Sequence, residues 1–338
     1  MSEKILEIND LRVQFKNGKE KVQPIRGVSF HINKGETLGI VGESGCGKSV
    51  TSLAIMGLLP DKTSEIASGN ILFNNQDLSK LTDKQFRKLR GNDISMIFQE
   101  PMTSLNPVFT IGEQLKEPLR RHKNMSKSQA RKEIISMLQQ VGLPRAEQLI
   151  DEYPHQLSGG MRQRVMISLA LLCKPQLMIA DEPTTALDVT IQAQILDLLK
   201  KLKAESDMSL MLITHDLGVV AEMCNRVVVM YAGEVVEEAE VNDLFDSPKH
   251  PYTKGLMQSL PSNNDRKSKL FSIKGQVPRP SEITGGCAFA NRCPHVLERC
   301  VKETPPSFTH QNHLSKCWLQ DTSYKEVNHD ETKGTAIR

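Results

Sequence analysis

The sequence predicts an α/β protein built on a parallel sheet, with an antiparallel layer at its start, a helical insertion and a small cysteine-rich module at its end. Two observations predict the sheet. Short apolar runs at residues 38–41, 177–180 and 210–214 alternate with helical patterns, a rhythm typical of βαβ units. A glycine-rich turn follows the first run and two carboxylates follow the second, at the sheet edge where open α/β folds bind ligands.

Composition indicates a globular protein large enough for about two domains. The 338 residues carry 43 Lys and Arg against 40 Asp and Glu, a net charge of +3, and the mean hydropathy is −0.35. No apolar stretch approaches the ~18–20 residues of a bilayer crossing. The first residues lack the features of a secretory signal, so we expect a cytoplasmic protein with reduced cysteines. Without a basic run of five, we expect no nucleic-acid partner.

The elements follow in order. Residues 5–32 alternate as strands do, which predicts an antiparallel subsheet, and a helix is expected at about 47–59. Residues 99–157 are mostly helical in pattern, with Gly142 as a stop signal. The helix after the second run has one buried stripe, made of Ile191, Ile195, Leu198, Leu199 and Leu202.

After about residue 240 the βαβ rhythm ends, and proline and polar residues become frequent. Four of the seven cysteines lie between Cys287 and Cys317. We therefore divide the chain into a main domain at 1–260, with its helical insertion at about 100–170, a cysteine-rich module at 261–320 and a flexible tail at 321–338.

Residues 42–49 match the pattern G-x-x-x-x-G-K-[ST] between a strand and a helix, the context of a phosphate-binding loop. Lys48 is expected to reach the β- and γ-phosphates, and Ser49 to ligate Mg²⁺. The glycines let backbone N–H groups and the helix N-terminus face the phosphates, whereas Cys46 is interpreted as a small packing residue. The expected binding residues are Gly42, Ser44, Gly45, Cys46, Gly47, Lys48, Ser49 and Val50.

Asp181 and Glu182 follow the apolar run at 177–180, and so lie at the same edge as the phosphate-binding loop. Asp181 suits the coordination sphere of Mg²⁺. Glu182 is placed to orient and deprotonate a water molecule that attacks the γ-phosphate. Together with the loop, this pair predicts ATP hydrolysis.

A second helix start with anion-binding features lies at residues 157–164, where Ser158 is an expected N-cap and Gly159 and Gly160 follow it. A single nucleotide needs only one phosphate-binding loop. We therefore expect this segment, which includes Gln163, to contact a nucleotide held by another copy or by a partner; the alternative is an ordinary capped helix.

The order and spacing of these motifs resemble those of ABC-transporter ATPase subunits over residues 5–260, which implies a P-loop ABC ATPase fold. The resemblance implies that Ser158–Gln163 form the signature motif and that Asp188 lies in the inter-subunit loop. It also implies that His215 contacts the γ-phosphate. Gln99 would sense Mg²⁺ and the membrane subunit, and Phe15 would stack on adenine, although a core role for Phe15 remains open.

Residues 98–107 and 250–253 and the cysteine-rich tail are together similar to the ATPase subunits of oligopeptide, dipeptide and nickel importers. This resemblance implies a subunit that powers peptide import by ATP-driven dimerisation. Its partners would be a second ATPase, homologous or identical, two membrane permease subunits and an extracytoplasmic substrate-binding protein, at the cytoplasmic face of the membrane. A nickel importer and a soluble ABC ATPase that acts on nucleic acids are the alternatives.

Four thiols lie within 31 residues, at Cys287, Cys293, Cys300 and Cys317, which suggests a metal site. The absence of C-x-x-C pairs weakens the case for structural zinc. Members of the resembling importer family carry a [4Fe–4S] cluster in this region, so the resemblance implies one here. Zn²⁺ and unligated thiols remain the alternatives.

Overall fold

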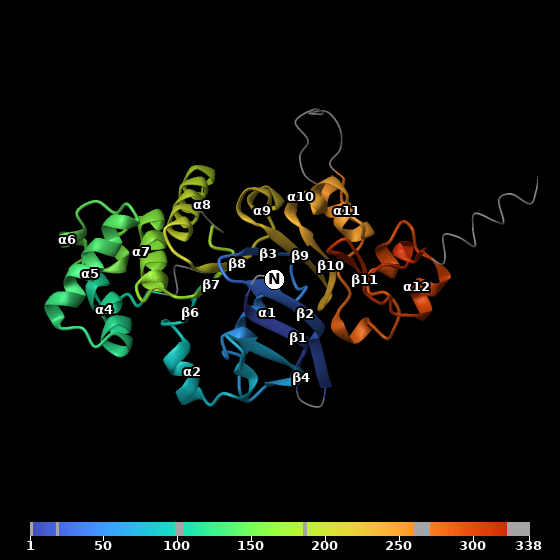
Figure 1. Cartoon of the computed structure of the whole chain (residues 1–338), viewed down its shortest axis with the longest axis horizontal. Helices are drawn as coiled ribbons and strands as arrows, with labels where there is room; N and C mark the ends of the chain where they lie inside the picture. Colours follow the sequence, from blue (N-terminus) through green and yellow to red (C-terminus); the bar gives the residue numbers. More distant parts are fainter. Residues whose placement is uncertain (1–2, 18–19, 99–104, 185–187, 260–270, 323–338) are drawn as a thin grey trace, which may run out of the picture.

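The computed structural model describes residues 3–17, 20–98, 105–184, 188–259 and 271–322, which form two sheets surrounded by helices (Figure 1). The strands are β1 (Lys4–Asn17), β2 (Glu20–Asn33), β3 (Thr37–Val41), β4 (Ser64–Phe73), β5 (Gln76–Asp77), β6 (Ile94–Ile97), β7 (Leu177–Asp181), β8 (Ser209–Ile213), β9 (Arg226–Tyr231), β10 (Glu234–Glu240), β11 (Phe308–His310) and β12 (His313–Ser315). The helices are α1 (Lys48–Ile55), α2 (Asp83–Leu89), α4 (Ile111–His122), α5 (Lys127–Gln140), α6 (Ala146–Leu149), α7 (Gly159–Leu171), α8 (Val189–Ala204), α9 (Leu217–Met223), α10 (Val241–Asp246), α11 (Pro251–Gln258) and α12 (Glu298–Lys302).

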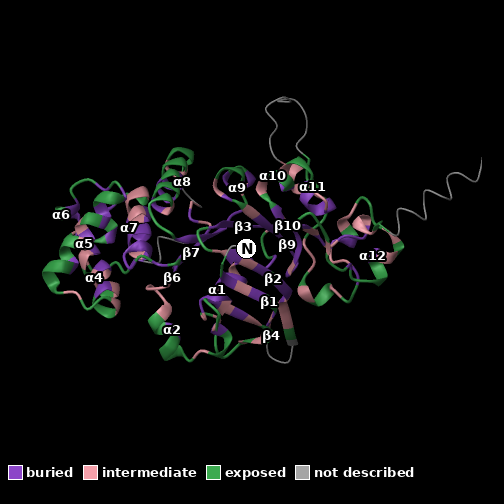
Figure 2. Cartoon of the chain, viewed as in Figure 1, coloured by how far each residue is buried: buried purple, intermediate pink, exposed green. Residues whose placement is uncertain are grey.

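The larger sheet has the strand order β11-β12-β10-β9-β3-β8-β7-β6. Strands β9, β3, β8, β7 and β6 are parallel neighbours, and β10, β12 and β11 continue the sheet antiparallel. Every residue of β3, β7 and β8 is buried, as expected for parallel strands covered on both faces (Figure 2). The carboxyl ends of β3 and β7 therefore lie at one edge of the sheet, as the sequence predicted.

The smaller sheet, β2-β1-β4-β5, is antiparallel throughout and confirms the predicted strand-rich start of the chain. Its apolar residues pack between the two sheets. Leu11, Val13 and Val28 are fully buried there together with Ile40 and Met230 of the central sheet. This layer fixes the strand that leads into the phosphate-binding loop.

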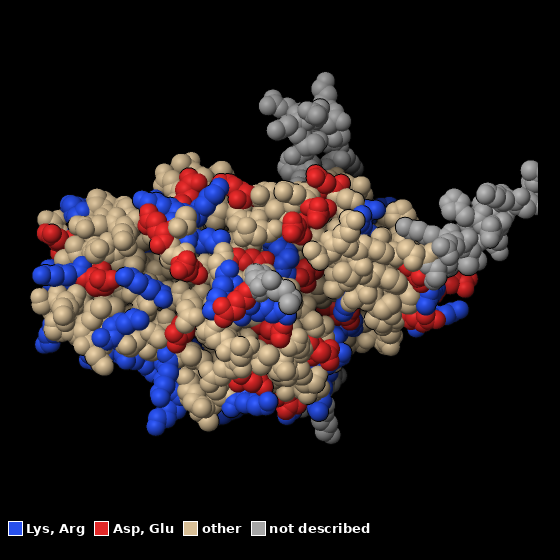
Figure 3. Space-filling view, in the orientation of Figure 1, with Lys and Arg blue, Asp and Glu red and all other residues tan. Residues whose placement is uncertain are grey.

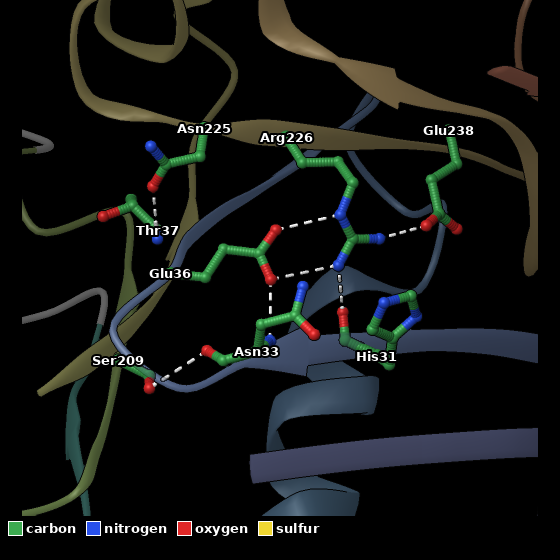
Figure 4. A network of polar contacts seen from close by, with 8 residues as sticks. All are labelled: His31, Asn33, Glu36, Thr37, Ser209, Asn225, Arg226 and Glu238. Carbon is green, nitrogen blue, oxygen red and sulfur yellow. Dashed lines mark hydrogen bonds and ion pairs between the residues drawn. The ribbon is translucent and has the colours of Figure 1, made fainter. Parts of the chain in front are cut away.

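A partly buried ion-pair network centred on Arg226 joins the two sheets (Figure 4). Its guanidinium group donates to Glu36 at 2.9 and 3.1 Å, to the His31 carbonyl at 2.6 Å, and to Glu238. Glu36 in turn accepts from the Asn33 backbone N–H at 2.7 Å. The network anchors the turn between β2 and β3 to β9 and β10.

The predicted helical insertion is present as α4, α5, α6 and α7, which pack beside β6 at one end of the molecule (Figure 1). Leu115, Leu119, Ile134 and Leu138 are buried in one core that continues to the central sheet. Helix α5 ends at Gln140, before Gly142 at φ 75°, so this glycine follows the helix end as the sequence indicated.

The C-terminal segment, defined here as residues 271–322, is not the separate module that the sequence suggested. Strand β12 pairs with β10 and so extends the central sheet. Phe289 is buried in the main core, and Glu237 of β10 forms a buried hydrogen bond with His313 Nε2 at 2.6 Å. The prediction of a cysteine-rich module is therefore not supported, because the segment shares both the sheet and the core of the preceding residues.

The surface carries both signs of charge. On the face seen in Figure 3, lysines and arginines lie among aspartates and glutamates. In the part of the chain that the structure describes, no helix combines the length and the apolarity of a membrane span.

Candidate functional site

The phosphate-binding loop begins where β3 ends, and two of its glycines have a steric reason. At Gly42 (φ 153°) a Cβ atom would lie 2.2 Å from the Met230 carbonyl oxygen. At Gly47 (φ 107°) it would lie 2.5 Å from Ile25 Cδ1. Because both contacts are shorter than real Cβ atoms allow, the close packing of the loop requires glycine.

The N-cap residue of α1 is Gly47, which has no side chain to cap the helix. The backbone N–H groups of the first turn therefore face the phosphate-binding loop without a side-chain cap. Uncapped N–H groups and the positive end of the helix dipole suit a phosphate group. Lys48 is buried, and its Nζ donates to the carbonyls of Gly42 at 2.7 Å and Glu43 at 3.1 Å. Ser44 and Gly45 are exposed, so the loop is open to a ligand on one side.

The remaining residues of the phosphate-binding loop differ in how far they are buried. Ser49 and Val50 lie half-buried in the first turn of α1. Cys46 is fully buried, and burial raises the pKa of its thiol. It therefore packs the inside of the loop, in agreement with its interpretation as a packing residue.

Asp181 is the last residue of β7 and is buried. Burial raises the pKa of its carboxyl group, and its Oδ1 has no hydrogen-bond partner among the described residues. The Ser49 side chain lies close enough to Asp181 to lower the pKa of that carboxyl group, so these two of the three predicted Mg²⁺ ligands are adjacent. A buried carboxylate oxygen without a partner, next to a serine hydroxyl, fits the oxygen ligands that Mg²⁺ prefers.

Glu182 and His215 face each other across adjacent strands. Glu182 Oε1 lies 3.4 Å from His215 Nδ1, and its backbone N–H donates to the Ile213 carbonyl at 2.9 Å. Glu182 has a φ of 47°, an uncommon conformation for a residue other than glycine. The structure thus brings the predicted catalytic carboxylate and the predicted γ-phosphate sensor together just beyond the ends of β7 and β8.

The predicted signature segment is the start of α7. Ser158 Oγ accepts from the Met161 backbone N–H at 3.3 Å, so it is the N-cap that the sequence predicted. Ser158 and Gly159 are exposed, and a Cβ atom on Gly160 would lie 3.2 Å from Ile191 Cγ2. A side chain at Gly160 would therefore press on α8.

Gln163 links this helix start to the loop after β7, and Asp188 caps the helix that follows that loop. Gln163 is fully buried, and its Nε2 donates to the Pro183 carbonyl. Asp188 caps α8 by accepting from the Ile191 backbone N–H at 2.9 Å. Gln163 therefore connects the start of α7 to the loop after β7, whereas Asp188 stabilises the start of α8.

Two further predicted residues are Phe15 and Gln99. Phe15 lies in β1, half-buried against the core between the sheets, so a core role and an adenine contact both remain open. Gln99 lies outside the described residues.

Sequence reasoning missed Tyr252, which it used only as part of the segment at 250–253. This tyrosine is fully buried at the start of α11, and its hydroxyl oxygen accepts from the Glu43 backbone N–H at 2.8 Å. It therefore supports the phosphate-binding loop from behind. Its chemistry gave no signal, because a tyrosine 209 residues from its partner reveals a contact only after folding.

The predicted [4Fe–4S] cluster is contradicted. Cys287, Cys293, Cys300 and Cys317 line one small cavity, yet among the described residues no group of three or more His, Cys, Asp or Glu side chains is arranged to hold a metal ion. Burial raises the pKa of Cys287 to about 12 and that of Cys317 to about 11, which favours thiols, whereas cluster ligands are thiolates. The zinc alternative fails on the same observation, and all four cysteines are free.

Comparisons with known proteins agree with the geometry of the nucleotide site. A model of the ABC transporter family matches residues 25–185, and one described as the C-terminal region of oligopeptide/dipeptide transporters matches residues 236–300. The oligopeptide transport ATP-binding protein AppD of Bacillus subtilis is 54% identical over 318 residues, which cover 94% of this chain and 97% of that protein. The dipeptide transport ATP-binding protein DppD of the same organism is 53% identical over 320 residues, covering 94% and 96%. A dimeric ATP-binding cassette, MJ0796 bound to ADP and Pi, is 31% identical, with a TM-score of 0.63 over 70% of this chain and 98% of that one.

Proposed function

The chain belongs to the ABC transporter family of ATP-binding proteins, and from that premise we propose that it hydrolyses ATP to power peptide import through a membrane permease. The observation that carries the peptide assignment lies outside the nucleotide site. Residues 236–300 match the C-terminal region of oligopeptide/dipeptide transporters. The two relatives at 54% and 53% identity are named for oligopeptide and dipeptide transport.

The chemistry is divided among few side chains. Lys48 and the uncapped start of α1 bind the phosphates of ATP. Ser49 and Asp181 would hold Mg²⁺, which neutralises charge on the phosphate oxygens when bound. Glu182 orients the attacking water molecule and accepts its proton, while His215 contacts the γ-phosphate. Phe15 stacks on the adenine ring.

ATP drives two such subunits together, as the dimeric cassette of similar fold suggests. The exposed Ser158 and Gly159 of one subunit then contact the nucleotide held by the other. Val189, which follows Asp188, is 83% exposed, and an apolar side chain so placed supports an interface at this loop. Gly160 and Gln163 keep the contacting segment in position.

The membrane partner docks beside the helical insertion. Val108 is 71% exposed and Phe109 49%, an apolar pair at the end of the family-like segment of residues 98–107. The complex includes two permease subunits and an extracytoplasmic substrate-binding protein, so this subunit is peripheral, at the cytoplasmic face of the membrane.

Reconstitution tests the proposal. The chain is combined in proteoliposomes with the permease and the substrate-binding protein that co-purify with it, and uptake of labelled peptides is measured with ATP inside or outside the vesicles. We expect peptide uptake only when ATP reaches this subunit, and none with Glu182→Gln. Nickel uptake without peptide uptake would instead assign a nickel importer. ATP hydrolysis with no permease partner would contradict a role in transport.

A further inference from the structure

One side chain of the C-terminal segment reaches the phosphate-binding loop. Arg292 Nη1 donates to Glu43 Oε2 at 2.6 Å, and its Nη2 donates to Glu43 Oε1 at 3.0 Å. This is a two-point pair of guanidinium and carboxylate, the geometry in which such pairs are strongest. The arginine side chain is 6% exposed and the glutamate 30%, so water screens the pair only partly.

Arg292 is itself held in place. Its Nε donates to the Lys274 carbonyl at 3.0 Å, and its Nη1 donates to the Tyr231 hydroxyl oxygen at 3.3 Å. The guanidinium carbon lies 5.8 Å from the ring centre of Tyr231 and 5.9 Å from that of Phe289. These contacts hold the guanidinium group in place independently of Glu43. The ion pair therefore restrains the phosphate-binding loop and not only the arginine.

Glu43 is restrained through each of its polar parts. Its backbone N–H donates to Tyr252, its carbonyl accepts from Lys48 at 3.1 Å, and its carboxylate pairs with Arg292. Tyr231, Tyr252 and Phe289 form an aromatic cluster with ring centres 4.7–5.4 Å apart behind the loop. The loop that binds the phosphates is thus supported by residues that follow the nucleotide site in sequence.

The pair also has an electrostatic consequence. Glu43 places a negative charge within the loop that must receive a triphosphate, and like charges in a partly buried site repel. Arg292 neutralises that charge. Without it, the carboxylate would oppose ATP binding, and the loop would lose one of the contacts that hold Glu43.

We propose that Arg292 is a positioning residue for ATP hydrolysis, which holds the phosphate-binding loop in its binding geometry and neutralises Glu43. The inference rests on the proposed ATPase function. It predicts a loss of ATP affinity rather than of the chemical step, since Arg292 contacts neither Glu182 nor His215 in any described interaction.

The test compares four full-length variants with the wild type by Mg²⁺-dependent ATPase kinetics and by equilibrium binding of ATP. For Arg292→Met we expect KM for ATP to rise roughly tenfold with kcat changed less than about twofold. Arg292→Lys keeps the charge but cannot form the two parallel hydrogen bonds of the guanidinium group, so KM for ATP should rise roughly threefold. Arg299→Met is the matched control with unchanged KM, because the described ion pairs of Arg299 lie within the C-terminal segment, with Glu303 at 2.8 Å and Asp321 at 3.1 Å.

The double variant Arg292→Met/Glu43→Gln separates the neutralisation of Glu43 from a general loss of stability. Removing the unpaired carboxylate should restore KM to within about threefold of the wild type, whereas a purely structural loss would not be relieved by a second substitution. An unchanged KM in Arg292→Met, or a double variant no better than Arg292→Met, would overturn the inference. If Arg292→Met does not fold, a wild-type KM in Arg292→Lys would overturn it. A wild type that hydrolyses no ATP would overturn the proposed function itself.

Discussion

At the residue scale, the strongest prediction concerns Glu182. The Glu182→Gln variant keeps shape and polarity but removes the proton acceptor, so ATP should bind while turnover falls roughly 10²-fold or more. Phosphate release and nucleotide binding are the measurements. Glu182 has a φ of 47°, an uncommon backbone conformation, so the fold of the variant is checked as a control. Its circular dichroism spectrum and melting temperature must match those of the wild type. Near-normal hydrolysis would remove Glu182 from the catalytic role.

A second residue, His250, makes stability depend on pH. It is fully buried at the start of α11, and its Nδ1 accepts from the Tyr252 backbone N–H at 3.0 Å. Burial lowers the pKa of His250 to about 4, against the opposing charge of Glu237. Between this value and its ordinary value of 6.5, the unfolded chain binds a proton that the folded chain does not, so stability falls as pH falls through that window.

We therefore expect the wild type to lose about 2 kcal/mol more than His250→Asn when pH is lowered from about 7.5 to about 5. Asparagine keeps the helix-capping acceptor but does not titrate. Urea unfolding at the two pH values measures the difference, with the exposed His295→Asn as control. Equal pH dependence in wild type and His250→Asn would show that His250 does not set this sensitivity.

At the element scale, the start of α7 is predicted to act on the nucleotide of the opposite subunit. Lys48→Ala chains lack the phosphate contact, and Ser158→Arg chains block the exposed start of α7. Each variant alone should be inactive. A mixed dimer contains one intact composite site, so mixing should restore part of the ATPase activity. No recovery in a mixture proven to exchange subunits would argue against action between subunits.

The segment before α4 is predicted to couple hydrolysis to transport. Replacing Val108 and Phe109 by serine removes exposed apolar area without touching the buried core. Basal ATPase activity should stay within about twofold of the wild type, while binding to the permease weakens roughly tenfold or more. Pull-down and transport assays measure the second effect. Loss of basal ATP hydrolysis with intact permease binding would contradict the assignment of this segment to the coupling of hydrolysis and transport.

Elements differ in how well the sequence predicted them. Strands β3, β7 and β8 are continuous apolar runs, and such runs identify buried parallel strands directly. Strand β10 carries Glu237 and Glu238 and gave no strand signal. Glu237 is buried and Glu238 half-buried, and their partners His313 and Arg226 come beside them only when the chain folds. The local pattern thus predicts an element whose buried side chains are apolar and misses one whose buried side chains are polar and need partners from other elements.

The same division holds for the candidate site. Lys48, Asp181 and Glu182 occupy motifs at strand ends, so the sequence predicted them correctly as neighbours of one sheet edge. The support of Glu43 by Tyr252 and Arg292 comes from residues 209 and 249 positions away. The four C-terminal cysteines show the opposite error, because their spacing and family resemblance suggested a cluster that the described geometry does not support.

At the scale of the whole molecule, the two sheets and the C-terminal segment converge on one loop. Strand β3 leads into it from the central sheet, Ile25 of β2 packs against Gly47, and Tyr252 and Arg292 hold Glu43. Parts that are far apart in sequence therefore share the nucleotide site. A subunit built in this way can respond as a unit when a second subunit closes over the bound nucleotide.

The last prediction is that ATP closes this dimer and that hydrolysis opens it. Glu182→Gln in Mg²⁺ and ATP should have twice the 37.8 kDa mass of one chain, whereas the nucleotide-free protein should have the mass of one. Light scattering after size-exclusion chromatography measures this. The control Lys48→Ala/Glu182→Gln lacks the phosphate contact and should remain a monomer. A dimer formed only after a homologous ATPase is added would assign a heterodimer, and a monomer under both conditions would contradict ATP-driven dimerisation.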